Sequence, residues 1–145
     1  MSESQIKHLE FIQSNISRMN QNSFQIKGWA ITIVSALLAI YAGSIKEKGN
    51  GNVVFIFVAI APTILFWLLD SYYLQQERKF CGVYNDVSNL SDKSSPQIDI
   101  REFEMPLNKY EGSKYRFFRV MWSKTEWPLY VTMILGLIAG GILIK

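Results

Sequence analysis

Three uncharged apolar blocks constrain the fold of this 145-residue chain more than any other feature. They are Gly28–Ile45, Val53–Leu69 and Trp127–Ile144, and none contains Asp, Glu, Lys, Arg or His. Each block is 17 or 18 residues long. That length is within the range of a membrane-spanning helix and exceeds the roughly 10–14 residues of an ordinary core helix. We therefore predict an all-α integral membrane protein with three transmembrane helices.

The segments between the blocks are too short to build a core of their own, so we predict a single membrane domain over residues 1–145. Its predicted parts, in chain order, are a cytoplasmic helix (1–27), the first span (28–45), an external loop (46–52), the second span (53–69), a cytoplasmic helix and loop (70–126) and the third span (127–144).

Basic residues predict the orientation of the chain. Nine of the Lys and Arg residues lie between positions 70 and 126, whereas the first loop has only Lys46 and Lys48 and the C-terminus only Lys145. Segments rich in Lys and Arg stay in the cytoplasm. We therefore expect the N-terminus inside and the C-terminus outside. The aromatic residues expected at the cytoplasmic interface are Trp29, Trp67, Tyr72, Tyr73 and Trp127.

Apolar residues in the first 27 positions follow a heptad-type spacing, which predicts a helix with one apolar seam. No proline or glycine interrupts it before Gly28, and one glycine inside a helix costs only about 1 kcal/mol. We predict one helix from about Glu3 to Ile45. Its predicted seam is Leu9, Ile12, Ile16, Met19, Ser23, Ile26, Ala30, Ile33, Leu37 and Ile40.

The second span is predicted to leave the membrane and continue as a helix to about Leu90, where Ser91 and Pro96 end it. Either each long helix covers its own apolar stripe, or the two extensions pack as an antiparallel pair, which would place Lys27 near Asp70. The seam predicted for this helix is Leu69, Tyr73, Gln76, Phe80, Val83, Val87 and Leu90.

Two residues of the second helix have alternative interpretations. Asp70 is either an ionisable group on an ion or proton path, or, as we favour, an interfacial carboxylate in water, paired with Lys27 or Lys124. Pro62 lies in the middle of the span and is a candidate hinge, although we favour a static kink.

Basic and bulky apolar residues alternate before the third block, which predicts a short interfacial helix. Its basic residues would contact anionic lipid headgroups, and an ordinary solvated linker is the alternative. The preceding segment, Ile98–Tyr110, is predicted to be either an extended strand or a loop. The residues assigned to headgroups are Lys114, Arg116, Arg119 and Lys124.

Small residues recur at helical spacing in the first and third spans. Such faces let helix backbones approach closely in a membrane. They serve packing within one chain or between copies, and the long seams favour a homo-oligomer. The small residues concerned are Ser35, Ala39, Gly43, Gly136 and Gly140.

The sequence offers little that supports catalysis. The one histidine, His8, is expected in an exposed part of the first helix, and the one cysteine, Cys81, has no supporting cluster. We find no triad, phosphate loop or metal-ligand spacing, so we expect no enzyme activity, no cofactor and no metal. Beside a span, basic and aromatic residues favour a membrane surface over nucleic acid.

Three segments carry a resemblance: FIQSNISRMNQNSFQIKGWAITIVSALLA, FWLLDSYYLQQERKFCGVYNDV and RVMWSKTEWPLY. Together they resemble a widespread group of small bacterial three-span membrane proteins, most of them hypothetical, which implies the bacterial inner membrane. In span number, long helices and size, the chain also resembles RipA-like octameric membrane proteins and the small membrane accessories of antiphage defence systems. That likeness implies a ring-like homo-oligomer and membrane perturbation during infection.

Three functions are consistent with these patterns. The first is an oligomeric inner-membrane effector that perturbs or permeabilises the membrane. The second is a non-catalytic membrane anchor or adaptor that holds a cytoplasmic protein partner. The third is a subunit of an enzyme without an active site of its own. All three involve the lipid bilayer as a partner.

Overall fold

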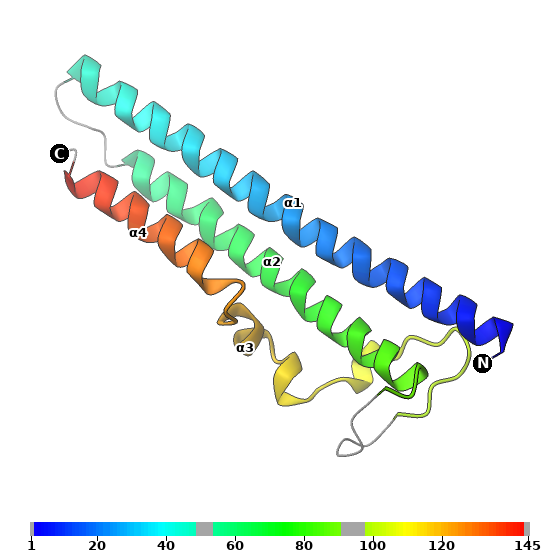
Figure 1. Cartoon of the computed structure of the whole chain (residues 1–145). Coiled ribbons are helices and arrows are strands. Elements are labelled where there is room, and N and C mark those ends of the chain that lie inside the picture. Colours follow the sequence, from blue (N-terminus) through cyan, green and yellow to red (C-terminus); the bar gives the residue numbers. More distant parts are fainter. Residues whose placement is uncertain (1, 49–53, 91–97, 144–145) are drawn as a thin grey trace. The chain divides into compact units, whose positions relative to one another are not determined.

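The computed structural model describes residues 2–48, 54–90 and 98–143, and in these residues it is helical with no strand. Figure 1 shows α1 (Glu3–Lys48), α2 (Val54–Val87), α3 (Phe117–Met121) and α4 (Trp127–Leu143). Two short 3-10 turns, Leu107–Lys109 and Ser113–Tyr115, precede α3. The predicted all-α fold is confirmed, and the described part of Ile98–Tyr110 is loop and turn rather than strand.

The helix α1 is continuous through Gly28, as predicted, and ends three residues beyond the expected Ile45. The helix α2 continues through Pro62 but ends at Val87, before the predicted Leu90. A backbone turn ends it, because Asn89 is left-handed (φ 55°) and the Leu90 and Asn89 N–H groups donate to the carbonyls of Asn85 and Asp86. The breakers expected at Ser91 and Pro96 lie outside the described residues.

The chain divides into two compact units. Unit 1 comprises Met1–Ser23 and Tyr72–Val120, and unit 2 comprises Phe24–Ser71 and Met121–Lys145. Both α1 and α2 contribute residues to each unit, and the division falls a few residues from the predicted ends of the spans.

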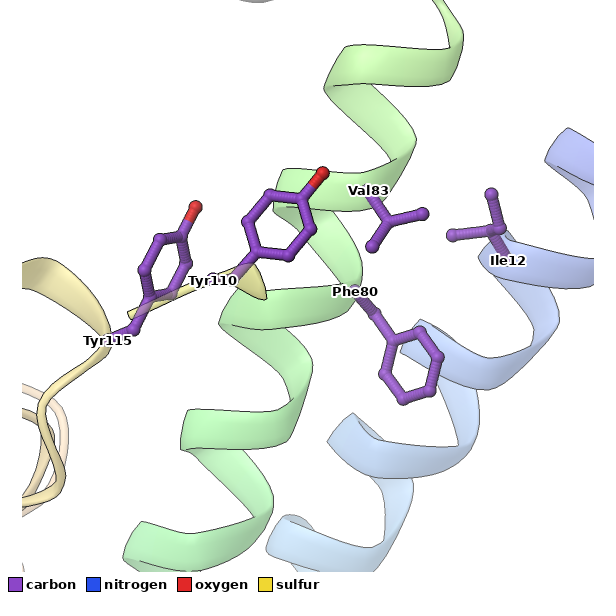
Figure 2. Close-up of a cluster of buried hydrophobic side chains, with 5 residues drawn as sticks. All are labelled: Ile12, Phe80, Val83, Tyr110 and Tyr115. Atoms are coloured by element: carbon purple, nitrogen blue, oxygen red, sulfur yellow. The ribbon is translucent and has the colours of Figure 1, made fainter. Parts of the chain in front are cut away.

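The core of unit 1 contains side chains from α1, α2 and the loop before α3. Ile12 of α1 lies beside Phe80 and Val83 of α2, and Tyr110 and Tyr115 pack against them (Figure 2). The early part of α1 therefore packs on the late part of α2, which confirms the antiparallel pair. Of the other predicted seam residues of this unit, Ser23 is buried, Leu90 is exposed and the rest are half-buried. Those packed on the core are Ile16, Met19 and Val87.

Unit 2 packs α1, α2 and α4 together. One cluster joins Val34 and Tyr41 of α1 with Ile56 of α2 and Leu137 of α4. A second cluster joins Ala30, Trp67 and Tyr130.

Beyond Ala30 the predicted seam of α1 is wrong at two positions, although Leu37 is half-buried and packs on the core of unit 2. Ile33 and Ile40 are exposed, and their neighbours Val34 and Tyr41 are buried instead. A straight helix has 3.6 residues per turn, so a strict seven-residue repeat drifts by about 20° per heptad. The buried face consequently moves to the next position along the helix.

Most apolar side chains in the membrane-length windows of α1 and α2 are not buried within the chain. The most apolar 18-residue windows of α1 and α2 are long and apolar enough to cross a membrane, yet only 17% and 33% of them are buried within the chain. The helix α4 is a shorter apolar helix of 17 residues. A core helix of a water-soluble protein would be mostly buried, so these faces are available to lipid or to other helices.

We predict that Gly82→Ala destabilises unit 1. A Cβ atom at Gly82 would lie 2.6 Å from the Tyr115 hydroxyl and 2.7 Å from the Tyr110 ring, both in the buried core. Overpacking of this kind costs about 1–3 kcal/mol. Thermal unfolding of the purified protein in detergent would measure the loss.

Gly28→Ala is the matched control. A Cβ atom at Gly28 has no neighbour within 4 Å, so alanine should raise helix stability by about 0.5–1 kcal/mol. Equal melting temperatures for the two variants would show that Tyr110 and Tyr115 do not pack on α2 as described.

Candidate functional site

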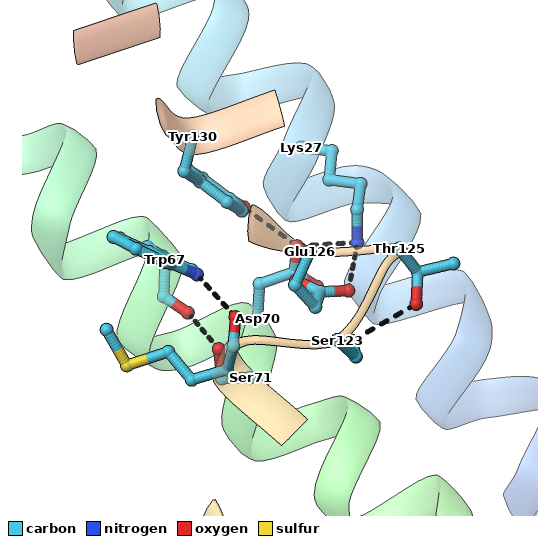
Figure 3. Close-up of polar contacts among 9 residues, drawn as sticks. Lys27, Trp67, Asp70, Ser71, Ser123, Thr125, Glu126 and Tyr130 are labelled. Atoms are coloured by element: carbon cyan, nitrogen blue, oxygen red, sulfur yellow. Dashed lines mark hydrogen bonds and ion pairs between the residues drawn. The ribbon is translucent and has the colours of Figure 1, made fainter. Parts of the chain in front are cut away.

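Four side chains of unit 2 form a charge cluster: Lys27 of α1, Asp70 of α2, Glu126 just before α4, and Tyr130 of α4. The Lys27 Nζ lies 2.5 Å from Asp70 Oδ2 and 2.9 Å from Glu126 Oε1. The Tyr130 hydroxyl donates to Asp70 Oδ2 at 2.8 Å (Figure 3). One lysine therefore joins two carboxylates from different elements.

The charge cluster is removed from water. Asp70 is 0% and Glu126 1% exposed, and the Lys27 side chain is 24% exposed. The predicted pairing of Asp70 with Lys27 is confirmed. The prediction that Asp70 is a carboxylate in water is wrong, because α4 and the segment before it cover it, and the alternative partner Lys124 is exposed.

Aromatic rings support the charge cluster. Trp67 stacks on Tyr130 with ring centroids 5.9 Å apart and 12° between the ring planes, and its Nε1 donates to the Met121 carbonyl at 3.2 Å. The Ser71 hydroxyl donates to the Trp67 carbonyl. Trp67 is consequently a buried residue, whereas the expected interface residues Trp29, Tyr72 and Trp127 are exposed.

Electrostatics distinguish Glu126 within the charge cluster. Burial disfavours its ionised form and raises its pKa to about 7; the side chain and negative charge of Asp70 act in the same direction, and Lys27 opposes them. Glu126 Oε2 is buried, and among the described residues no hydrogen-bond donor reaches it. The charge cluster ties α1, α2 and the start of α4 together, and it is a place where the ionised form of Glu126 is disfavoured.

The sequence contained a signal for Glu126 that we did not use. Lys27 is the last charge before the first apolar block, Asp70 the first charge after the second, and Glu126 the last charge before the third. Charges that flank spans on one side of a bilayer lie at the same depth, so the three residues were candidates for contact.

The small residues predicted to pack are mostly unused within the chain. Ser35 and Ala39 are exposed, a Cβ atom at Gly43 or Gly136 meets nothing within 4 Å, and one at Gly140 meets only Leu38, at 3.9 Å. At Gly141 of α4, an added Cβ atom would meet the tip of the Ile56 side chain, which would have to shift. This close approach depends on tertiary packing that the spacing of small residues did not reveal.

The residues predicted to contact lipid headgroups are all exposed, but they do not share one helix. The helix α3 spans only Phe117–Met121, so Lys114, Arg116 and Lys124 lie in flanking turns and loop. Pro106, Gly112 and the turn at Ser113–Tyr115 prevent a longer helix. Arg119 donates to the Ser113 hydroxyl, which holds this basic surface in place.

Other reactive side chains do not form a catalytic arrangement in the described residues. His8 is buried, contrary to the prediction, and its Nε2 lies 3.2 Å from the Glu104 carbonyl oxygen. Burial and the negative charge of Glu77 raise the pKa of the Cys81 thiol. No group of three or more His, Cys, Asp or Glu side chains is placed to bind a metal ion in the part of the chain that the structure describes.

Unit 1 also contains a polar pocket of about 380 Å³. Its described lining residues include three carboxylates, so the described part of its wall is rich in negative charge. The lining residues are Gln5, His8, Asp86, Val87, Asn89, Ile98, Asp99, Ile100 and Glu102.

No protein-family model matches the chain, and neither a curated protein nor a solved structure is similar to it.

We predict that Lys27→Met strongly destabilises unit 2 at pH 8. It leaves two buried carboxylates without their ammonium partner, and removing one member of a buried ion pair costs about 3–5 kcal/mol. Adding Asp70→Asn and Glu126→Gln should restore most of the loss, because the neutral cluster has no uncompensated charge. Thermal unfolding in detergent is the measurement.

Lys7→Met is the control on the same helix. Lys7 also pairs with a carboxylate, Glu3 at 3.0 Å, but both side chains are exposed and the pair contributes little. Similar losses for the two lysine variants would contradict a special role for the charge cluster.

Proposed function

We propose that this protein is a three-span membrane protein of the bacterial inner membrane, with its N-terminus inside and its C-terminus outside, that assembles into a homo-oligomer and perturbs or permeabilises the bilayer. The observation that carries the proposal is the distribution of side chains in unit 2, which is the reverse of that expected for a water-soluble protein. The ionisable side chains Asp70 and Glu126 are buried, whereas large apolar side chains such as Phe57, Leu65 and Ile142 are exposed. This distribution suits a helix bundle surrounded by lipid.

Assembly from several copies is supported by the open faces of α1 and α4. A Cβ atom at Gly43 or Gly136 would have no neighbour within 4 Å among the described residues, so another helix backbone can approach closely there. A passage for ions would also require several copies, because the Thr32 and Thr63 hydroxyls of one chain bond to their own helix at the Gly28 and Ala59 carbonyls.

The exposed basic surface supports contact with anionic lipid. Arg116 and Arg119 flank Phe118, which is 74% exposed, so charged and apolar groups are offered together to the headgroup region. On the resemblance alone, we propose antiphage defence as the biological setting. From its place in the middle of the second span, we also propose Pro62 as the hinge at which α2 flexes.

A membrane anchor for a cytoplasmic protein is the second candidate. Unit 1 has its own core, and Phe11 and Phe103 are 56% and 58% exposed on it. Exposed aromatic side chains of this kind are typical contact points for a protein partner. This function requires no change in membrane permeability, so one measurement separates the two candidates.

We predict that the purified protein releases dye from liposomes and that release increases when anionic lipid is included. Neutralising the basic surface by Lys114→Gln, Arg116→Gln and Arg119→Gln should reduce the lipid dependence, because headgroup attraction is lost. Fluorescence dequenching measures release. An inserted, oligomeric protein that releases no dye from either vesicle would exclude the effector and leave the anchor.

We predict that Gly136→Leu lowers the oligomer mass in nanodiscs while the single chain keeps its fold. Leucine meets no atom of its own chain near the Cβ position but prevents close approach of a second helix. Ala61→Leu, at an exposed small residue of α2, is the control and should leave the mass unchanged. An unchanged mass for Gly136→Leu would show that this face meets lipid.

A further inference from the structure

The charge cluster contains two carboxylates and one ammonium group. Lys27 bonds to both Asp70 and Glu126, and the third helix supplies only the neutral hydroxyl of Tyr130. When both carboxylates are ionised, two negative charges share the single ammonium group of Lys27 in this buried place. Buried charges without a counter-charge are strongly disfavoured, and such groups usually take up or release a proton instead.

The two carboxyl groups are also close to each other. Asp70 and Glu126 lie within hydrogen-bonding reach, while Glu126 Oε2 receives no bond from any described donor. Two carboxylates only accept hydrogen bonds, so a bond between them requires one proton. A proton on Glu126 would satisfy the orphaned oxygen by donation to Asp70, and it would balance the charge.

We propose that the Asp70–Glu126 pair is a proton-binding site whose occupancy controls how tightly the start of α4 packs on α1 and α2. With the proton bound, Lys27 balances the remaining carboxylate and the three elements are held together. When the proton leaves, the two carboxylates repel each other and draw water between the helices. This inference does not depend on whether the protein permeabilises membranes.

The groups facing Glu126 are Lys27 from α1, Asp70 from α2 and Tyr130 from α4. Burial raises the pKa of Glu126 from 4.5 to about 7, which agrees with proton binding near neutral pH. A carboxyl whose pKa is higher in the folded protein stabilises the fold fully below the unfolded value of 4.5. That contribution is lost as the pH rises through about 7, so unit 2 should loosen above neutrality.

Infrared spectroscopy of the full-length protein in nanodiscs tests the proton directly. Protein labelled with ¹³C-glutamate should show a protonated glutamic carboxyl band at pH 5.5 that disappears by pH 8.5, and Glu126→Gln should lack it. Absence of the band in the wild-type protein at pH 5.5 would overturn the proposal, and this readout needs no variant to fold.

The packing change is followed by the fluorescence of Trp67, which stacks on Tyr130 beside the charge cluster. For this measurement we define a parent protein in which the three exposed tryptophans are replaced by phenylalanine: Trp29, Trp122 and Trp127. Emission should shift to the red as the pH rises from 5.5 to 8.5, with a midpoint near the pKa of about 7.

Glu126→Gln should hold the emission at its low-pH value throughout, because the amide is neutral and donates to Asp70 like the protonated acid. Glu111→Gln, at an exposed glutamate, should retain the wild-type shift. A shift that persists in Glu126→Gln, or emission that does not respond to pH in the parent protein, would refute control by this site.

Discussion

The ion pairs of Lys27 constrain the rest of unit 2. Removing charges from water costs several kcal/mol per ion, so the buried carboxylates Asp70 and Glu126 must keep the half-buried Lys27 in good geometry. Lys27 has one partner on α2 and another just before α4. These contacts set which turn of α1 lies beside which turn of α2, and they bring the start of α4 to the same place. Apolar packing alone tolerates sliding of one helix along another, whereas this charge cluster does not.

The packing around the charge cluster follows from that constraint. Trp67 and Tyr130 stack immediately beside it, and hydroxyl groups deeper in the bundle bond to carbonyls of their own helix, as Thr63 does to Ala59. These hydroxyl groups are thereby satisfied inside unit 2 while many apolar side chains remain outside, and the Tyr41 hydroxyl and Glu126 Oε2 are buried without a partner among the described residues. Such a distribution is unfavourable in water and favourable in lipid, which is why the arrangement supports a membrane location.

Most of the fold could be predicted from the periodicity of apolar residues. The spacing of Ile12, Phe80 and Val83 correctly predicted the buried face of unit 1, because seven-residue and 3.6-residue periods differ little over a few turns. Over the whole of α1 the difference accumulates, so Val34 is buried and Ile33 is not. Charge and length predicted three apolar helices, but membrane insertion, orientation and assembly remain predictions.

The candidate site was only half predictable, for a physical reason. Lys27 and Asp70 lie on helices joined in sequence, so pairing them needed only the antiparallel arrangement of α1 and α2. Glu126 lies just before α4, after a long segment of loop and short turns, and no helical periodicity in that segment indicates that Glu126 approaches Lys27. The burial of Asp70 was missed for the same reason, since Tyr130 of α4 packs on it. Without Glu126 the pair is neutral and has no reason to bind a proton; with it, the proton becomes part of the packing of three helices.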